Sequence, residues 1–244
     1  MTSPAVTSDK FWEAFRFFWD NFPTYNKAQT YSYFSLMKLA PGTYMWGMAP
    51  FFSTDKTVAE TNTLLKPFFS KAKSLGIDLA INTTYYDSFY PAYQATFGPN
   101  NYYVGGAGST PGNRMLPTEN WADATIRNAT FSAVQNAVEK VLMLNVYHQR
   151  PNDDFNKGQN SVNPAFRNEQ SMIVAINNIV DQTAAGWKAG NAQLTNEIIG
   201  PLRDVSPKGG PYGNEADVSE PDWQRSFGVL TILGCLALRR SMTL

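Results

Sequence analysis

The order of the segments along the chain is the feature that most constrains its fold. Aromatic residues at helical spacing predict an amphipathic helix between residues 8 and 22, with Ser8 in a position to cap it. Two strands are predicted next, at residues 30–39 and 43–48, joined by a turn at Ala40-Pro41-Gly42. An amphipathic helix must bury its apolar face, and the strands come as a pair, so this order predicts helices packed on an antiparallel sheet.

The remaining segments continue the same alternation. Further helices are predicted at residues 54–75, 125–142 and 184–202, and further strands at residues 77–84, 143–147 and 210–214. Residues 172–180 are compatible with a strand or a helix, and their β-branched content favours a strand. Residues 97–120 are rich in Gly, Pro and Asn, which predicts a long loop. The predicted fold class is α+β, with a large, mainly antiparallel sheet covered by helices.

Composition and charge narrow the classes of function. The 244 residues contain 20 Lys plus Arg and 20 Asp plus Glu, so the formal net charge is zero. Surfaces that bind nucleic acid or anionic membranes normally carry a basic excess, so this balance argues against both partners. The longest apolar stretch, residues 229–238, is far shorter than the roughly 20 residues that span a bilayer. Residues 1–6 have neither the charge nor the apolar run of a signal peptide.

The sequence gives little support for a metal site or for a histidine-based catalytic site. The single cysteine excludes an internal disulfide and a cysteine-based zinc site, and the single histidine excludes histidine-pair motifs, so no metal site is predicted. His148 is close to Asp153 and Asp154 in the sequence, which leaves a histidine-based hydrolase as one alternative. A lone histidine at a strand end is more often a hydrogen-bonded or solvated residue.

The most specific information lies near the C-terminus. Residues 205–224 read Val-Ser-Pro-Lys-Gly-Gly-Pro-Tyr-Gly-Asn-Glu-Ala-Asp-Val-Ser-Glu-Pro-Asp-Trp-Gln. This segment resembles the C-terminal signature of the berberine-bridge-enzyme-like, FAD-linked oxidoreductases, especially the fungal ones, which is close to V-S-P-G-x-G-x-Y-x-N-E-A-D-x-x-E-P-x-W-Q. Blocks at residues 30–34, 48–52, 86–90, 117–121 and 162–168 are similar to family blocks in the same order, so the resemblance covers residues 8–227.

The resemblance implies a flavoprotein and a division of the chain. Residues 1–204 correspond to the substrate-binding α+β domain, and residues 205–227 to part of the berberine-like C-terminal segment. The family's N-terminal FAD-binding domain has no counterpart in these 244 residues, so the resemblance implies a fragment of an FAD enzyme. Residues 228–244 match the family's continuation only in an offset reading frame. We interpret this tail as frame-shifted, the alternative being a genuine apolar helix.

Two residues of the signature are candidate site residues by this resemblance. Tyr212 matches the tyrosine of the family's Y-x-N block and is the candidate catalytic base, a role for which a phenol needs a cationic or hydrogen-bonding environment. Asn214 follows two residues later in a predicted strand, so its side chain is expected on the same face, where it would bind the flavin ring or the substrate. The structural alternative is that these residues close and cap a turn.

Other polar residues have weaker assignments. Glu215 and Asp217 are expected to face elsewhere and to hold the following loop. Four tyrosines line either a substrate cavity or the core, and alternating aromatics on a strand more often belong to the core. They are Tyr31, Tyr33, Tyr86 and Tyr90.

These features predict the substrate-binding part of an FAD-dependent oxidoreductase. Such an enzyme would oxidise an alcohol, a sugar or a secondary-metabolite substrate by hydride transfer to flavin, with this small molecule as its expected partner. The chain alone is expected to be inactive because the FAD domain is missing. The alternative is a non-catalytic binding or interaction module derived from the same fold. The oligomeric state and the localisation stay open, although intact relatives of this family are often secreted.

Overall fold

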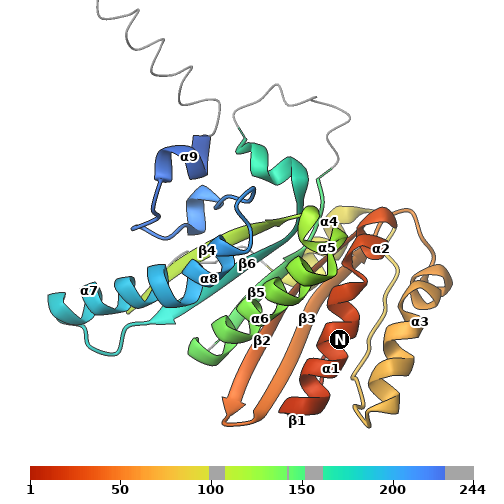
Figure 1. The fold of residues 1–244 in the computed structure, drawn as a ribbon. Coiled ribbons are helices and arrows are strands. Elements are labelled where there is room, and N and C mark those ends of the chain that lie inside the picture. The colour runs from red at the N-terminus through yellow and green to blue at the C-terminus, as the bar shows by residue number, and fades with distance from the viewer. Residues whose placement is uncertain (99–107, 142, 152–161, 229–244) are drawn as a thin grey trace, which may run out of the picture.

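The computed structural model describes residues 1–98, 108–141, 143–151 and 162–228. In these residues the chain forms a six-stranded sheet with the strand order β1-β3-β2-β5-β6-β4, and each pairing is antiparallel (Figure 1). The strands are β1 (Val6–Thr7), β2 (Thr30–Ala40), β3 (Thr43–Ser53), β4 (Ser109–Pro117), β5 (Met143–His148) and β6 (Glu169–Asn178). The predicted α+β class with a mainly antiparallel sheet is confirmed.

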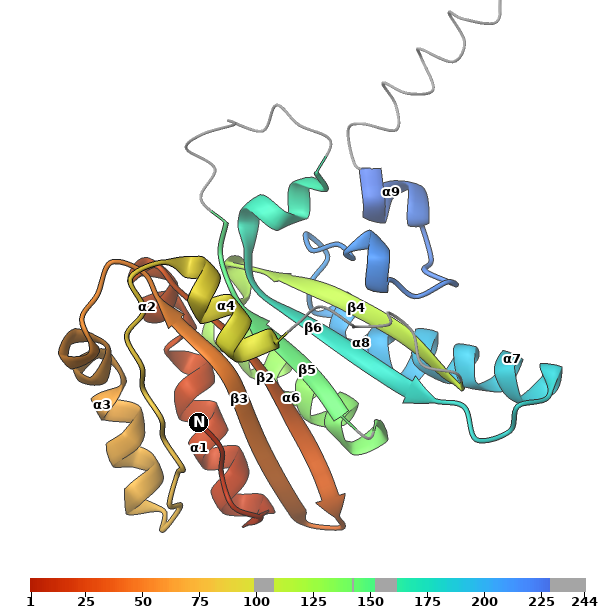
Figure 2. The ribbon, with the colours of Figure 1, turned by 180° about the vertical axis from the view of Figure 1, so that it is seen from behind.

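Helices cover one face of the sheet much more fully than the other (Figures 1 and 2). We call the side of Phe34 and Leu36 the closed face, and the side of Tyr31 and Tyr33 the open face. The closed face carries α1 (Ser8–Asp20), α2 (Phe22–Lys27), α3 (Val58–Ser74), α5 (Glu119–Ala122), α6 (Ala124–Lys140), α7 (Ala184–Gln193), the π-helix η2 (Leu194–Ile198) and α8 (Ile199–Asp204). The open face carries α4 (Phe89–Phe97) and the 3-10 turns η1 (Pro164–Asn168) and η3 (Gly213–Glu215), and the described chain ends in α9 (Trp223–Gly228).

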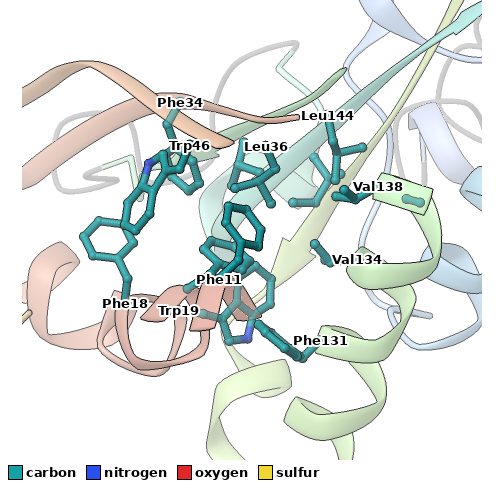
Figure 3. Packing of buried hydrophobic residues seen from close by; sticks show 14 of the residues in the cluster. Phe11, Phe18, Trp19, Phe34, Leu36, Trp46, Phe131, Val134, Val138 and Leu144 are labelled. Atoms are coloured by element: carbon teal, nitrogen blue, oxygen red, sulfur yellow. The ribbon is translucent and has the colours of Figure 1, made fainter. Parts of the chain in front are cut away.

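The main hydrophobic core lies between the closed face and the helices. Phe18 and Trp19 of α1 are fully buried and pack in the same cluster as Phe34 and Trp46 of the sheet (Figure 3). Successive side chains of a strand point to opposite faces, so β2 sends Phe34 into this core and Tyr33 to the open face. The aromatic spacing of the first predicted helix therefore supplies much of the core.

The helix starts differ from those predicted. The N-cap of α1 is Thr7 rather than Ser8, which is the first helical residue. The predicted start of α3 at residue 54 or 55 is wrong, because Thr57 forms a capping box with Glu60. The Thr57 Oγ1 accepts the Glu60 backbone N–H at 3.2 Å, and the Glu60 carboxylate accepts the Thr57 backbone N–H at 2.8 Å. This reciprocal pair satisfies two helix-end donors, which fixes the start of the helix at that point.

One strand lies within the segment predicted to be a loop. β4 forms inside residues 97–120 and lies at the edge of the sheet, with β6 as its neighbour. An edge strand tolerates Pro111, because a proline has no N–H to donate to a second neighbour. Gly112 allows a close approach by the helical layer, since a Cβ at this position would lie 2.9 Å from the Ile199 Cγ1. The composition that predicted a loop is thus compatible with an edge strand.

Two described segments that were predicted to be strands, residues 77–84 and 210–214, do not form strands. Within residues 77–84 only Ala80 pairs, through two backbone hydrogen bonds of 2.9 Å with Thr2. Within residues 210–214 only Gly210 pairs, its carbonyl accepting the Met115 N–H at 2.8 Å before the chain turns into η3. Each segment makes a single bridge and does not extend it: Ala80 pairs with Thr2 outside any named strand, and the chain leaves β4 after Gly210 to form η3.

The described residues contain no helix that combines the length and the apolar character required to cross a bilayer. The predicted frame-shifted tail begins at the last residue of α9, and its residues 229–244 lie outside the described residues.

Candidate functional site

The candidate residues Tyr212 and Asn214 lie together beside the open face. Tyr212 is half-buried and immediately precedes η3, and Asn214 is exposed within that turn. The Asn214 Nδ2 donates a hydrogen bond of 2.6 Å to the Tyr212 Oη. The two side chains therefore meet through a tight turn, and the predicted strand geometry between them is wrong.

A buried asparagine that no sequence pattern identified fixes this turn to the sheet. The side chain of Asn113 in β4 makes two hydrogen bonds with the main chain of Tyr212. Its Oδ1 accepts the Tyr212 N–H at 2.7 Å, and its Nδ2 donates to the Tyr212 carbonyl oxygen at 2.8 Å. The Tyr212 ring also packs edge-on against Phe166, with the ring centroids 5.5 Å apart. Asn113 thus fixes the position of the Tyr212 main chain relative to the sheet.

A buried ionic cluster holds the segment that follows. Glu220, the glutamate of the family-like Glu-Pro pair, accepts hydrogen bonds from the Arg203 guanidinium at 2.8 and 3.2 Å and lies 3.6 Å from the Arg114 Nη1. Arg114 also donates to the Ser206 carbonyl oxygen at 2.6 Å. Burial lowers the pKa of Arg114 to about 10, against the raising effect of Glu220. This part of the signature therefore has a structural role.

Three half-buried tyrosines form a row on the open face, and we call Tyr31, Tyr33 and Tyr147 the tyrosine row. Tyr33 and Tyr147 are register partners on neighbouring strands, with ring centroids 4.8 Å apart. Burial is the main cause that raises the pKa of Tyr31 to about 12 and also raises the pKa of Tyr147, so both remain protonated at neutral pH. The charge of Glu215 contributes to both pKa shifts, so its carboxylate acts on the tyrosine row rather than only on the following loop.

A cavity of about 480 Å³ opens next to the tyrosine row. Its walls come from the end of β3, the start of α3 and residues 83–92. Phe52 lines this cavity and stacks on Tyr31, with ring centroids 6.1 Å apart. Tyr86 also lines it and is 38% exposed, and Tyr90 is 65% exposed, so the core interpretation is wrong for these two residues. The open face therefore carries the tyrosine row and, next to it, a cavity that is lined in part by aromatic residues.

His148 lies on the other side of the sheet. Its side chain is completely buried, its Nε2 is 3.2 Å from the Phe22 carbonyl oxygen, and burial lowers its pKa to about 3. A neutral imidazole enclosed in the core has no access to a substrate, so the structure contradicts the histidine-based hydrolase. The described residues also contain no group of three or more His, Cys, Asp and Glu side chains arranged to hold a metal ion.

Comparisons with known proteins relate the chain to flavoproteins. No family model matches it. It is 25% identical over 226 residues to the FAD-linked oxidoreductase patO of Aspergillus clavatus, covering 91% of this chain and 38% of the relative. The VAO-type flavoprotein MtVAO713 of Myceliophthora thermophila C1 superposes with a TM-score of 0.79 at 17% identity, covering 98% of this chain and 44% of that one. A BBE-like protein of Physcomitrella patens superposes with a TM-score of 0.58 at 12% identity, covering 96% and 49%.

These comparisons confirm the predicted resemblance. The chain is related to fungal FAD-linked oxidoreductases, and its fold is that of the matching part of VAO-type and BBE-like flavoproteins. It spans 38–40% of the length of the first three curated relatives.

Proposed function

We propose that this relative of the fungal FAD-linked oxidoreductases is the substrate-binding part of an enzyme that oxidises an alcohol, a sugar or a secondary metabolite by hydride transfer to flavin. The observation that carries the proposal is the hydrogen-bonded pair of Tyr212 and Asn214 at the edge of an open sheet face. One face of the sheet is closed by helices, so a ligand has access only to the other, where the tyrosine row and the adjoining cavity lie.

The residues around η3 fit one edge of a flavin ring. The Asn214 amide uses its Nδ2 on Tyr212, and its Oδ1 has no partner among the described residues, so this oxygen can accept a ring N–H. Beside it, a Cβ placed on Gly213 would have no atom within 4 Å, so there is space for a planar group. When bound, the flavin supplies the acceptor for the hydride. Asn214 is the residue that we assign to holding it.

Tyr212 is the residue that we assign to taking up the proton of the substrate hydroxyl. The Asn214 N–H donated to its Oη fixes the orientation of the phenolic group, and the two Asn113 hydrogen bonds fix the main chain beneath it. A positioned proton acceptor of this kind typically contributes about 10²- to 10⁴-fold to a rate. Because these residues form one wall of the proposed flavin site, we expect the purified chain to retain no flavin and to catalyse no oxidation.

A chimaera tests the proposal. The chain would replace the matching part of the Aspergillus clavatus relative, and the bound flavin would be measured from its absorbance after desalting. We expect flavin to be retained in the parent chimaera and in Tyr212→Phe, and the flavin content or spectrum to change in Asn214→Ala. Tyr212→Phe should slow substrate-driven flavin reduction by about 10²-fold or more.

The control variant is Tyr44→Phe, which removes a hydroxyl that hydrogen-bonds to Glu139 on the closed side of the sheet. It should reduce its flavin as fast as the parent. The assignment of Tyr212 fails if Tyr212→Phe and Tyr44→Phe behave alike, and the assignment of Asn214 fails if Asn214→Ala leaves the flavin unaffected.

A further inference from the structure

Glu215 is a half-buried carboxylate without a side-chain partner. Its carboxylate makes no hydrogen bond or ion pair with any described residue, although its backbone N–H donates to the Tyr212 carbonyl oxygen at 3.3 Å. Burial raises the pKa of Glu215, and no described cation offsets this effect. A carboxylate withdrawn from water in this way is normally paired, so this one is available to a positively charged group of a ligand.

Glu215 lies on a turn beside the tyrosine row. The turn that carries it is fixed to β4 by Asn113, and Tyr212 packs in the same small cluster as Tyr147. Met172 of that cluster is the register partner of Tyr147, and Tyr147 is the register partner of Tyr33. The turn that carries Glu215 therefore lies on the open face beside the tyrosine row, and the charge of Glu215 contributes to the raised pKa of both Tyr31 and Tyr147.

Aromatic rings beside an unpaired carboxylate favour one kind of ligand. The face of a tyrosine ring carries a negative quadrupole that attracts cations, and an ammonium group over several rings is stabilised by each of them. The carboxylate adds a negative charge. A neutral hydroxyl group of a ligand would compensate this charge only in part, and an anionic group would be repelled by it. The ring faces and the carboxylate are both negative, so together they favour a positively charged ligand group.

We propose that the tyrosine row and Glu215 form a recognition site for a positively charged ammonium group of the substrate. The inference rests on the proposed function only in taking this group to be part of the substrate that is oxidised. It narrows the substrate class to molecules that carry an ammonium group beside the position that is oxidised, and it assigns Glu215 to specificity, a role different from the predicted one of holding the loop.

Direct binding to the purified chain tests the inference without flavin. Choline and 3,3-dimethylbutan-1-ol have nearly the same shape, and only choline is charged, so their affinities can be compared by ligand-observed NMR titration. We expect choline to bind at least about tenfold more tightly than the neutral alcohol, and Glu215→Gln to remove most of this difference. Tyr31→Phe keeps the ring and should stay within about twofold of the parent, whereas Tyr31→Leu should weaken choline binding about fivefold.

The matched control is Glu197→Gln, which removes an exposed carboxylate that pairs with Lys140 on the closed side of the sheet. Circular dichroism would verify that each variant is folded. The inference is overturned if choline fails to bind, if the neutral alcohol binds as tightly, or if Glu215→Gln and Glu197→Gln have the same affinity for choline. Loss of flavin from the chimaera with choline binding retained would count against the proposed function alone, and the reverse result against this inference alone.

Discussion

Replacing Glu220 by Gln should destabilise the protein far more than a typical charge removal. The Glu220 side chain is 1% exposed and lies between Arg114, which is 4% exposed, and Arg203, which is 20% exposed. Two unit charges about 4 Å apart interact by about 4 kcal/mol at the effective dielectric constant of 20 that suits such sites. Breaking a buried pair on one side typically costs about 3–5 kcal/mol, because the remaining charge stays buried without compensation. We expect a loss in this range for Glu220→Gln, discounted for the partly exposed Arg203.

Urea unfolding followed by tryptophan fluorescence would measure this loss, with Glu197→Gln as the control. The Lys140–Glu197 pair is joined at 2.9 Å but its side chains are 31% and 55% exposed, so its removal should cost about 0–1 kcal/mol. Hydrogen exchange should also quicken first at residues 205–227, because Glu220 ties them to β4 and α8. Equal unfolding midpoints for the two variants would refute the reasoning, since they would mean that burial adds nothing to this ion cluster.

Two further predictions concern a buried carboxylate and a pair of glycines. Burial raises the pKa of Glu169 to about 8 from an ordinary value of 4.5, so the folded state keeps a proton that the unfolded chain releases, and the free energy of unfolding should fall between pH 4.5 and 8 and level off above. Urea midpoints across this range should lose that slope in Glu169→Gln. Gly209→Ala should cost about 1–3 kcal/mol, because its Cβ would lie 2.2 Å from the Met115 carbonyl oxygen. Gly213→Ala, with nothing within 4 Å, should be neutral or slightly stabilising, and equal melting temperatures for these two variants would contradict the packing argument.

The sequence predicted the elements whose periodicity is enforced by a single buried face. The aromatic spacing of α1 and the alternation in β2 and β3 follow from burial against one core, and both were identified from the pattern. β4 was missed because an edge strand needs few ladder donors, so Pro111 and Gly112 could enter it without breaking it. The strand predicted at residues 77–84 failed for the opposite reason, since its residues favour extended backbone and no strand lies beside them.

The candidate site was predictable only where the resemblance named residues. Tyr212 and Asn214 came from the Y-x-N block, and their side chains do meet. Asn113 could not be identified from the sequence, because a single polar residue in an edge strand follows no periodic pattern. Its importance comes from its contact with Tyr212, 99 residues away in the sequence. Glu215 was expected to face elsewhere because a strand alternates its side chains, whereas the 3-10 turn that forms instead follows a different geometry.

The two faces of β2 explain why one side of this sheet can remain partly exposed. Its closed side carries Phe34 and Leu36, which have no polar atoms in their side chains and are fully buried by helices. Its open side carries Tyr31 and Tyr33, whose rings are almost as large but end in hydroxyl groups that need water, a protein partner or a ligand. Both sides are aromatic enough to be taken for core from the sequence. The hydroxyl groups make partial exposure tolerable, so a tyrosine in place of a phenylalanine at alternate positions marks the side of the sheet that the helices cover less.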